Sequence, residues 1–203
     1  MTTPCFDKNR VTGVVLAGGE ARRMGGQDKG LVPIAGRPMI EYILSAVQDQ
    51  VHTLIINANR NRDRYRQYGY PVIGDEFQGF NGPLAGMASA MRVIATELMV
   101  TVPCDSPYIP ADLVSRLYAQ LQKDQADISV AHDGERMQPV FSLMKRGLLD
   151  SLLEYLDKGE RKIDRWFGQH RLVMTDFSDK SETFINLNTP EDVQNIEASL
   201  AHA

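Results

Sequence analysis

Short apolar runs that each end at a polar or glycine-rich loop limit what this chain can fold into. Three of them, at residues 11–17, 53–56 and 98–102, are rich in valine, leucine and isoleucine, as are strands buried on both faces of a sheet. After the first run, Pro38 could open a helix. Apolar residues then recur at three- and four-residue spacing, as in an amphipathic helix with one apolar stripe: Met39, Ile40, Ile43, Leu44 and Val47. The alternation predicts a Rossmann-like, doubly wound α/β fold in which right-handed crossovers join parallel strands.

The second half of the chain departs from this alternation. A predicted helix at residues 113–121 is followed by two strand-like segments, 127–132 and 137–144, separated by Asp133-Gly134. Asp-Gly is a favoured hairpin turn, so we expect antiparallel strands beside the parallel ones. With no repeat, low-complexity tract or linker in the sequence, we expect residues 1–203 to form a single domain: a mostly parallel, mixed sheet with helices on both faces.

Charge and composition argue against several classes of protein. Twenty-two Lys and Arg against 26 Asp and Glu leave a net charge of −4, so the chain has no overall positive field for nucleic acid. Two cysteines are too few for a disulfide framework or a cysteine-rich zinc site, and we expect Cys104 to be a small buried residue. No apolar run approaches the ~18 residues of a membrane span, and the first residues lack the apolar core of a signal peptide. We expect a cytoplasmic protein, monomeric by default, that binds neither nucleic acid nor a membrane.

The loop after the first predicted strand is the most informative segment. Between Leu16 and Lys29 it holds four glycines and three basic residues, and glycines let consecutive backbone N–H groups turn toward an anion such as phosphate. Its spacing matches neither G-x-G-x-x-G nor G-x-x-x-x-G-K-[ST]. The alternative is an ordinary glycine-rich connection with solvated basic side chains, but such connections usually have about 2–6 residues. The loop therefore favours a phosphate site of another kind.

The same loop resembles that of the nucleotidyltransferases of sugar-nucleotide and cofactor synthesis, whose signature is Leu-x-Gly-Gly, three residues, Arg-Met-Gly and then a lysine. The matching residues are Leu16-Ala17-Gly18-Gly19, Arg23-Met24-Gly25 and Lys29. Within that superfamily the chain is most similar to the bacterial molybdenum cofactor guanylyltransferases, in order and over nearly its whole length. The further matching segments are Asn57-Ala58-Asn59-Arg60, Gly82-Pro83-Leu84-Ala85-Gly86, Pro103-Cys104-Asp105-Ser106-Pro107-Tyr108-Ile109-Pro110, His132-Asp133-Gly134-Glu135-Arg136 and Asn186-Leu187-Asn188-Thr189-Pro190-Glu191.

The resemblance implies a reaction in which the terminal phosphate of the molybdenum–molybdopterin cofactor attacks the α-phosphorus of GTP and releases pyrophosphate. The nucleophile is already anionic, so the protein has to align two negative groups and neutralise the leaving group. This agrees with the four scattered histidines and with the lack of an evident nucleophile–base pair. It also implies a nucleotide-binding half at about 11–110 and a cofactor-substrate half at about 111–203.

The nucleotide side of the expected site begins in the glycine loop. Lys29 and Arg23 are the expected partners of the β- and γ-phosphates and, with Asp105, the expected catalytic residues. The resemblance places the backbone of the preceding segment against GTP, at Leu16, Ala17, Gly18 and Gly19. Asp105 follows a buried strand, and Mg²⁺ suits one carboxylate together with phosphate oxygens and water, so Asp105 is the expected ligand of a Mg²⁺ cofactor. Its alternative role is that of a turn or helix-cap residue.

Further contacts are implied on both sides of the site. Asn57 and Asp75 come directly after strands, where the family contacts guanosine, although each could be only a turn former. Gly82 and Pro83 offer a rigid, side-chain-poor backbone to a base edge. The resemblance places Asn186 and Asn188, which we expect on one face of a strand, toward the molybdopterin. In addition, Thr189 and Pro190 have the residue types of a helix N-terminus.

Two other functions remain open at this point. A related cytidylyltransferase or sugar-phosphate nucleotidyltransferase would share the same loop, because composition does not determine the base. A non-catalytic GTP-binding protein that delivers cofactor belongs to another class, although a switch GTPase normally carries the P-loop spacing that is absent here. Proteins that supply the cofactor and molybdoenzymes that accept it are possible partners.

Overall fold

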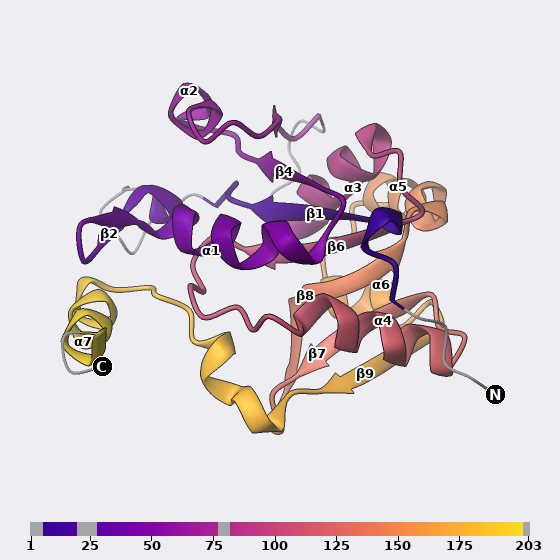
Figure 1. Cartoon of the computed structure of the whole chain (residues 1–203). Coiled ribbons are helices and arrows are strands. Elements are labelled where there is room, and N and C mark those ends of the chain that lie inside the picture. Colours follow the sequence, from indigo (N-terminus) through magenta and orange to yellow (C-terminus); the bar gives the residue numbers. More distant parts are fainter. Residues whose placement is uncertain (1–5, 20–27, 77–81, 201–203) are drawn as a thin grey trace.

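The computed structural model describes residues 6–19, 28–76 and 82–200. Within these ranges the chain forms a seven-stranded mixed sheet with the strand order β5-β4-β1-β6-β8-β7-β9 (Figure 1). In chain order the strands of this sheet are β1 (Val11–Leu16), β4 (Thr53–Asn57), β5 (Val72–Ile73), β6 (Leu98–Pro103), β7 (Ile128–His132), β8 (Met137–Lys145) and β9 (Leu172–Asp176). The predicted α/β class and the mixed sheet are confirmed.

The first half of the sheet is parallel. β1 pairs in parallel with β4 on one side and with β6 on the other, and β5 continues the sheet beyond β4. Val14 and Val15 of β1 are both fully buried but belong to opposite hydrophobic clusters, because successive side chains of a strand point to opposite faces. This explains why the central strands are continuous apolar runs.

The second half contains the predicted hairpin of β7 and β8, which pair antiparallel. β8 also pairs antiparallel with β6, and β9 runs parallel to β7. The later strand β8 is therefore inserted between β6 and β7, an order that the sequence did not predict. One continuous sheet runs through both halves of the chain.

Helices cover both faces of this sheet, as expected (Figure 1). The clusters that hold their buried side chains place α1 (Met39–Val47) and α4 (Leu113–Lys123) on one face and α3 (Pro83–Val93), α5 (Leu149–Asp157) and α6 (Ile163–Phe167) on the other. The predicted apolar stripe of α1 is confirmed, since Met39, Ile40, Ile43, Leu44 and Val47 are all buried. The remaining α-helices described are α2 (Arg62–Arg66) and α7 (Pro190–Leu200).

Several short elements were not predicted from the sequence. A two-strand hairpin, β2 (Pro33–Ile34) and β3 (Arg37–Pro38), precedes α1, so Pro38 ends a strand rather than opening the helix. The 3₁₀ helices in the described part of the chain are η1 (Lys8–Arg10), η3 (Lys29–Leu31), η4 (Gln48–Gln50), η5 (Arg146–Leu148) and η6 (Ser178–Phe184). They are one or two turns long, too short to leave a periodic pattern in the sequence.

The prediction of a strand around Asn186 and Asn188 is wrong. Residues 185–189 form neither helix nor strand. The Leu187 N–H instead donates to the Asp105 carbonyl at 2.8 Å. The segment is thus joined to the residues after β6 by an isolated backbone hydrogen bond, which fixes its position without a strand ladder.

Candidate active site

A cavity of about 800 Å³ lies where β1 and β6 end, between the first residues of β8 and the segment before α7. The expected residues that line it are Leu16, Ala17, Gly18, Gly19, Lys29, Asp75, Gly82, Pro83, Asp105, Asn186 and Asn188. Open α/β sheets bind ligands outside the carboxyl ends of their strands, so the cavity has the position of a ligand site. Arg23, also expected here, lies outside the described residues.

Three segments that are far apart in the sequence meet at Lys29. Its ammonium donates to Asp105 Oδ2 at 2.8 Å and to Asn188 Oδ1 at 2.5 Å. The side chains of Lys29 and Asp105 keep 20% and 16% of their exposure, so this ion pair is partly shielded and still open to the cavity. A charge pair in a sheltered site is screened less by water and salt than a surface pair.

The backbone that carries Lys29 is anchored from behind. Asp28 is buried, lines the cavity and accepts hydrogen bonds from the Tyr65 hydroxyl and, at 3.1 Å, from Asn61 Nδ2. Burial above all, together with the hydrogen bond to Asp28, raises the pKa of Tyr65, which therefore stays a proton donor. A Cβ on Gly30 would lie 2.6 Å from the Tyr65 hydroxyl, so glycine is needed there. Asp28 was not predicted from the sequence. The feature that could have indicated it is an acidic residue within a loop that carries three basic ones.

Asp75 is held by two asparagine side chains. Asn57 Nδ2 donates to one carboxylate oxygen at 2.9 Å and Asn59 Nδ2 to the other at 2.8 Å. The Asp75 N–H returns a hydrogen bond to Asn59 Oδ1 at 2.8 Å. Asn59 lines the cavity, whereas Asn57 is buried and is not among its described lining residues. Asn57 thus supports Asp75 from behind, and its expected contact with guanosine stays a prediction.

Close packing behind this pair also explains one glycine of α3. A Cβ on Gly86 would lie 2.4 Å from Asn57 Oδ1. Any larger residue would displace the Asn57 amide and with it the Asp75 carboxylate. Pro83 occupies the first turn of the same helix, a position where proline is favoured.

The opposite wall comes from β8. The ladder between β6 and β8 runs from Leu98–Lys145 to Thr101–Ser142, and the earlier residues of β8 line the cavity beyond its end. With the preceding Arg136, these residues are Met137, Gln138, Pro139, Val140 and Phe141. The sequence pattern alone did not mark this wall, although Arg136 belongs to one of the segments that carry the family resemblance.

The segment before α7 forms the remaining wall. Asn186 Oδ1 accepts a hydrogen bond from the Ser106 hydroxyl at 2.6 Å, next to the backbone bond between Leu187 and Asp105. The helix then begins as its sequence suggested: the Asp192 N–H donates to Thr189 Oγ1 at 3.1 Å, and the Thr189 N–H donates to Asp192 Oδ2 at 2.8 Å. This reciprocal cap stabilises the first turn of α7, which follows the segment that carries both asparagines.

Cys104 lies in the cavity wall and is buried, as expected. Burial first, and then the neighbouring carboxylate of Asp105, raises the pKa of its thiol. The thiol therefore stays protonated at neutral pH, unlike the thiolate that binds metals or acts as a nucleophile.

Acidic side chains at the cavity suit a metal that relies on its substrate for ligands. Among the described residues, no three His, Cys, Asp or Glu side chains cluster as a metal site. Asp105 nevertheless faces the cavity. Mg²⁺ commonly uses one or two carboxylates and completes its shell with phosphate oxygens and water. The residues present therefore fit a Mg²⁺ that arrives with a nucleotide.

Lys29 follows a glycine loop and pairs with an aspartate that comes just after a neighbouring parallel strand, the arrangement expected of an α/β nucleotidyltransferase. The family model described as "MobA-like NTP transferase domain" matches residues 13–173. The chain belongs to this family.

Individual relatives agree with this assignment. The molybdenum cofactor guanylyltransferase of Shewanella sediminis is 50% identical over 192 residues, which cover 95% of this chain and 98% of that protein. The protein of the same name from Shewanella amazonensis is 50% identical over 191 residues, which cover 94% and 97% of the two chains. The crystal structure of molybdopterin-guanine dinucleotide biosynthesis protein A from Archaeoglobus fulgidus is similar with a TM-score of 0.79 at 22% identity, covering 95% of this chain and 100% of that chain. This last likeness shows the shared fold.

Of the helices in the described part of the chain, none is long and apolar enough to cross a membrane.

Proposed function

We propose that this protein transfers GMP from GTP to the terminal phosphate of the molybdenum–molybdopterin cofactor and releases pyrophosphate. The relatives that are about half identical to it carry the name of this activity. The observation that carries the proposal is the position of Lys29, between Asp105 of the nucleotide side and Asn188 of the second-substrate side. A group at this junction can act on both anionic substrates.

The nucleotide occupies the side formed by β1 and α3. The backbone of Leu16 to Gly19 lies against GTP, and Gly82 and Pro83 border the base. Asp75 presents a carboxylate whose two oxygens are already oriented by amide donors. Such an acceptor complements the N–H donors on the edge of guanine.

Charge neutralisation is the main catalytic task. Lys29 moves from Asp105 toward the β- and γ-phosphates and stabilises the charge that develops on pyrophosphate. Arg23, which belongs to the same glycine loop, shares this role. When Mg²⁺ is bound, Asp105 holds it, and the ion supplies further charge neutralisation and alignment of the phosphates.

The second substrate lies between Asn186, Asn188 and the wall from β8. No side chain has to be activated as a nucleophile, because the attacking phosphate is anionic. The enzyme gains its rate from alignment of the two phosphates, which is the main contribution in phosphoryl-type transfers. Its expected state as a cytoplasmic monomer, and its exchange of cofactor with other proteins, stay predictions.

Pyrophosphate release by the purified protein tests this function. With the molybdenum cofactor and Mg²⁺ present, we expect release with GTP and much less with CTP, ATP or UTP. Release with CTP instead of GTP would make the protein a cytidylyltransferase. Tight GTP binding without any release would favour the non-catalytic delivery protein.

A further inference from the structure

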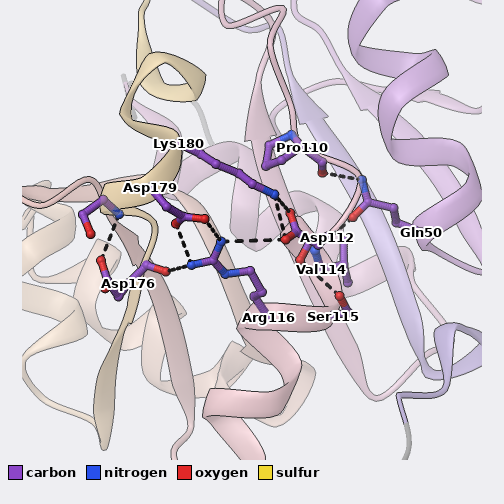
Figure 2. Close-up of polar contacts among 10 residues, drawn as sticks. Gln50, Pro110, Asp112, Val114, Ser115, Arg116, Asp176, Asp179 and Lys180 are labelled. Carbon is purple, nitrogen blue, oxygen red and sulfur yellow. Dashed lines mark hydrogen bonds and ion pairs between the residues drawn. The ribbon is translucent and has the colours of Figure 1, made fainter.

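A network of ion pairs joins the start of α4 to η6, away from the cavity (Figure 2). Arg116 of α4 donates to both carboxylate oxygens of Asp179, at 3.0 and 2.9 Å, and also to the carbonyl oxygen of Asp176. Lys180 donates to both oxygens of Asp112 at 2.7 and 2.8 Å. None of these described side chains lines the cavity. The network therefore has no direct contact with a ligand there.

On the α4 side of the network, the start of the helix is held firmly by the rest of the protein. Gln50 is buried, accepts from the Val114 N–H at 3.0 Å and donates to the Pro110 carbonyl at 2.9 Å (Figure 2). Leu113 and Val114 are fully buried in the main core. The first turn of α4 is thus tied to the rest of the protein through both packing and hydrogen bonds.

On the η6 side, the backbone is less regular, and its position depends on contacts with other elements. Lys180 has a non-helical backbone, with φ −143° and ψ 40°, in the middle of η6. Bidentate pairing of a guanidinium with a carboxylate restricts orientation as well as distance. The Arg116–Asp179 pair can therefore set the position of η6 against α4 where helix geometry does not.

Aromatic packing connects the same place to the cavity wall. The guanidinium of Arg116 lies 4.2 Å from the ring centroid of Phe177, which is fully buried. Phe177 packs edge-on against Phe184 at 5.8 Å, and Phe184 against Phe141 at 4.9 Å. Phe141 lines the cavity, and Asn186 follows Phe184 by two residues. The arginine is thus linked to the second-substrate wall by side-chain packing and by the chain itself.

We propose that Arg116 is a positioning residue for the second substrate, because its pairing with Asp179 sets where η6 delivers Asn186 and Asn188 to the cavity. The inference rests on the proposed function, in which these two asparagines face the molybdenum cofactor. It assigns a role in substrate binding to a charged cluster that would otherwise only stabilise the surface.

A matched pair of variants separates positioning from plain stability. Arg171 pairs with Asp127 in the same bidentate way, at 3.0 and 2.9 Å, next to the opposite end of β9. Arg116→Gln is the test variant and Arg171→Gln the control. Asp179→Asn is a second test variant that leaves the contact between Arg116 and Phe177 in place.

Steady-state kinetics provide the first readout. For Arg116→Gln and Asp179→Asn we expect KM for the molybdenum cofactor to rise about tenfold, since ångström-scale misplacement of binding groups costs up to about a hundredfold. KM for GTP should stay about the same, because the proposed GTP contacts of Leu16 to Gly19 and Asp75 lie outside the network. Arg171→Gln should change neither constant. Equal effects of the test and control variants on the cofactor KM would overturn the proposal.

Hydrogen exchange provides a readout that does not need activity. We expect the amides of residues 182–188 to exchange faster in the two test variants than in the wild type and in Arg171→Gln, at similar thermal stability of all variants. Unchanged exchange in this segment would refute the positioning role even if the wild type proved inactive. Absence of pyrophosphate release by the wild type would instead refute the proposed function. The two failures are therefore distinguishable.

Discussion

Lys29 and Asp105 form an ion pair of 2.8 Å although 76 residues separate them in the chain. The pair joins the start of η3, directly after the glycine loop, to the residues that follow β6. Because Asp105 is also the proposed Mg²⁺ ligand, the ammonium of Lys29 lies at a carboxylate that the metal needs. In the proposed mechanism, Lys29 would exchange Asp105 for phosphate oxygens when Mg²⁺ and GTP bind.

Replacement of Lys29 should abolish most of the activity. Loss of one preorganised charge stabiliser typically costs about 3–4 kcal/mol in the transition state, on the order of a hundredfold or more in rate. We expect Lys29→Ala to reduce kcat by this factor while thermal unfolding stays close to that of the wild type, because the side chain faces the cavity. Lys123→Ala, at an exposed lysine of α4, is the control. A near-normal rate for Lys29→Ala would remove this residue from the mechanism.

Replacement of Asp105 should change the response to magnesium. For Asp105→Ala we expect the Mg²⁺ concentration that gives half-maximal activity to rise at least about tenfold, since a carboxylate ligand is lost. GTP binding without metal should be partly retained, because the contacts of the glycine loop and of Asp75 remain. An unchanged magnesium titration would show that another carboxylate holds the ion and that Asp105 serves only as the partner of Lys29.

The two asparagines before α7 should differ in effect. Asn186 lines the cavity on the proposed second-substrate side and contacts Ser106 rather than Lys29. We therefore expect Asn186→Ala to raise KM for the molybdenum cofactor and to leave GTP affinity intact. Asn188 holds Lys29, so Asn188→Ala should in addition lower kcat. Thr189→Ala is the matched control, because loss of the helix cap costs about 1 kcal/mol of stability without removing a cavity residue. Identical kinetic effects of the two asparagine variants would contradict this division.

Acid should weaken the ion pair between Asp127 and Arg171, next to the start of β9. Hydrogen bonds from Arg171 first, and from Lys145, lower the pKa of Asp127 in the folded protein. A carboxylate with a lowered folded pKa stabilises the protein above its unfolded pKa of about 3.9, and this contribution is lost as the pH falls toward the folded value. Urea unfolding of the wild type and of Asp127→Asn should therefore differ most at neutral pH, and the difference should begin to shrink as the pH falls below about 4. A difference that grows toward acid would contradict the stabilising charge on Asp127.

Much of the fold is readable from local pattern. Continuous apolar runs such as residues 11–17 and 98–102 predicted buried parallel strands. The apolar stripe on residues 39–47 predicted a helix packed on one face of the sheet. Asp133-Gly134 marked the hairpin of β7 and β8. These signals are local, because burial on one or both faces and turn geometry leave their mark within a few residues.

Contacts between distant segments depended on the tertiary structure. The sequence pointed to Lys29, Asp75, Asp105, Asn186 and Asn188 one by one, through strand ends and family resemblance. It did not show that Asn57 supports Asp75 from behind or that Tyr65 holds Asp28.

The sequence by itself thus determined the class of fold, the residue types of the glycine loop and about half of the described residues that line the cavity. The tertiary structure alone decided that β8 is inserted beside β6, that its first residues form a wall, and that Arg116 ties η6 to α4. The physical reason is that strand order and side-chain contacts result from the packing of whole elements around a common core. Periodicity along the chain records which face of an element is buried, but not which neighbour buries it.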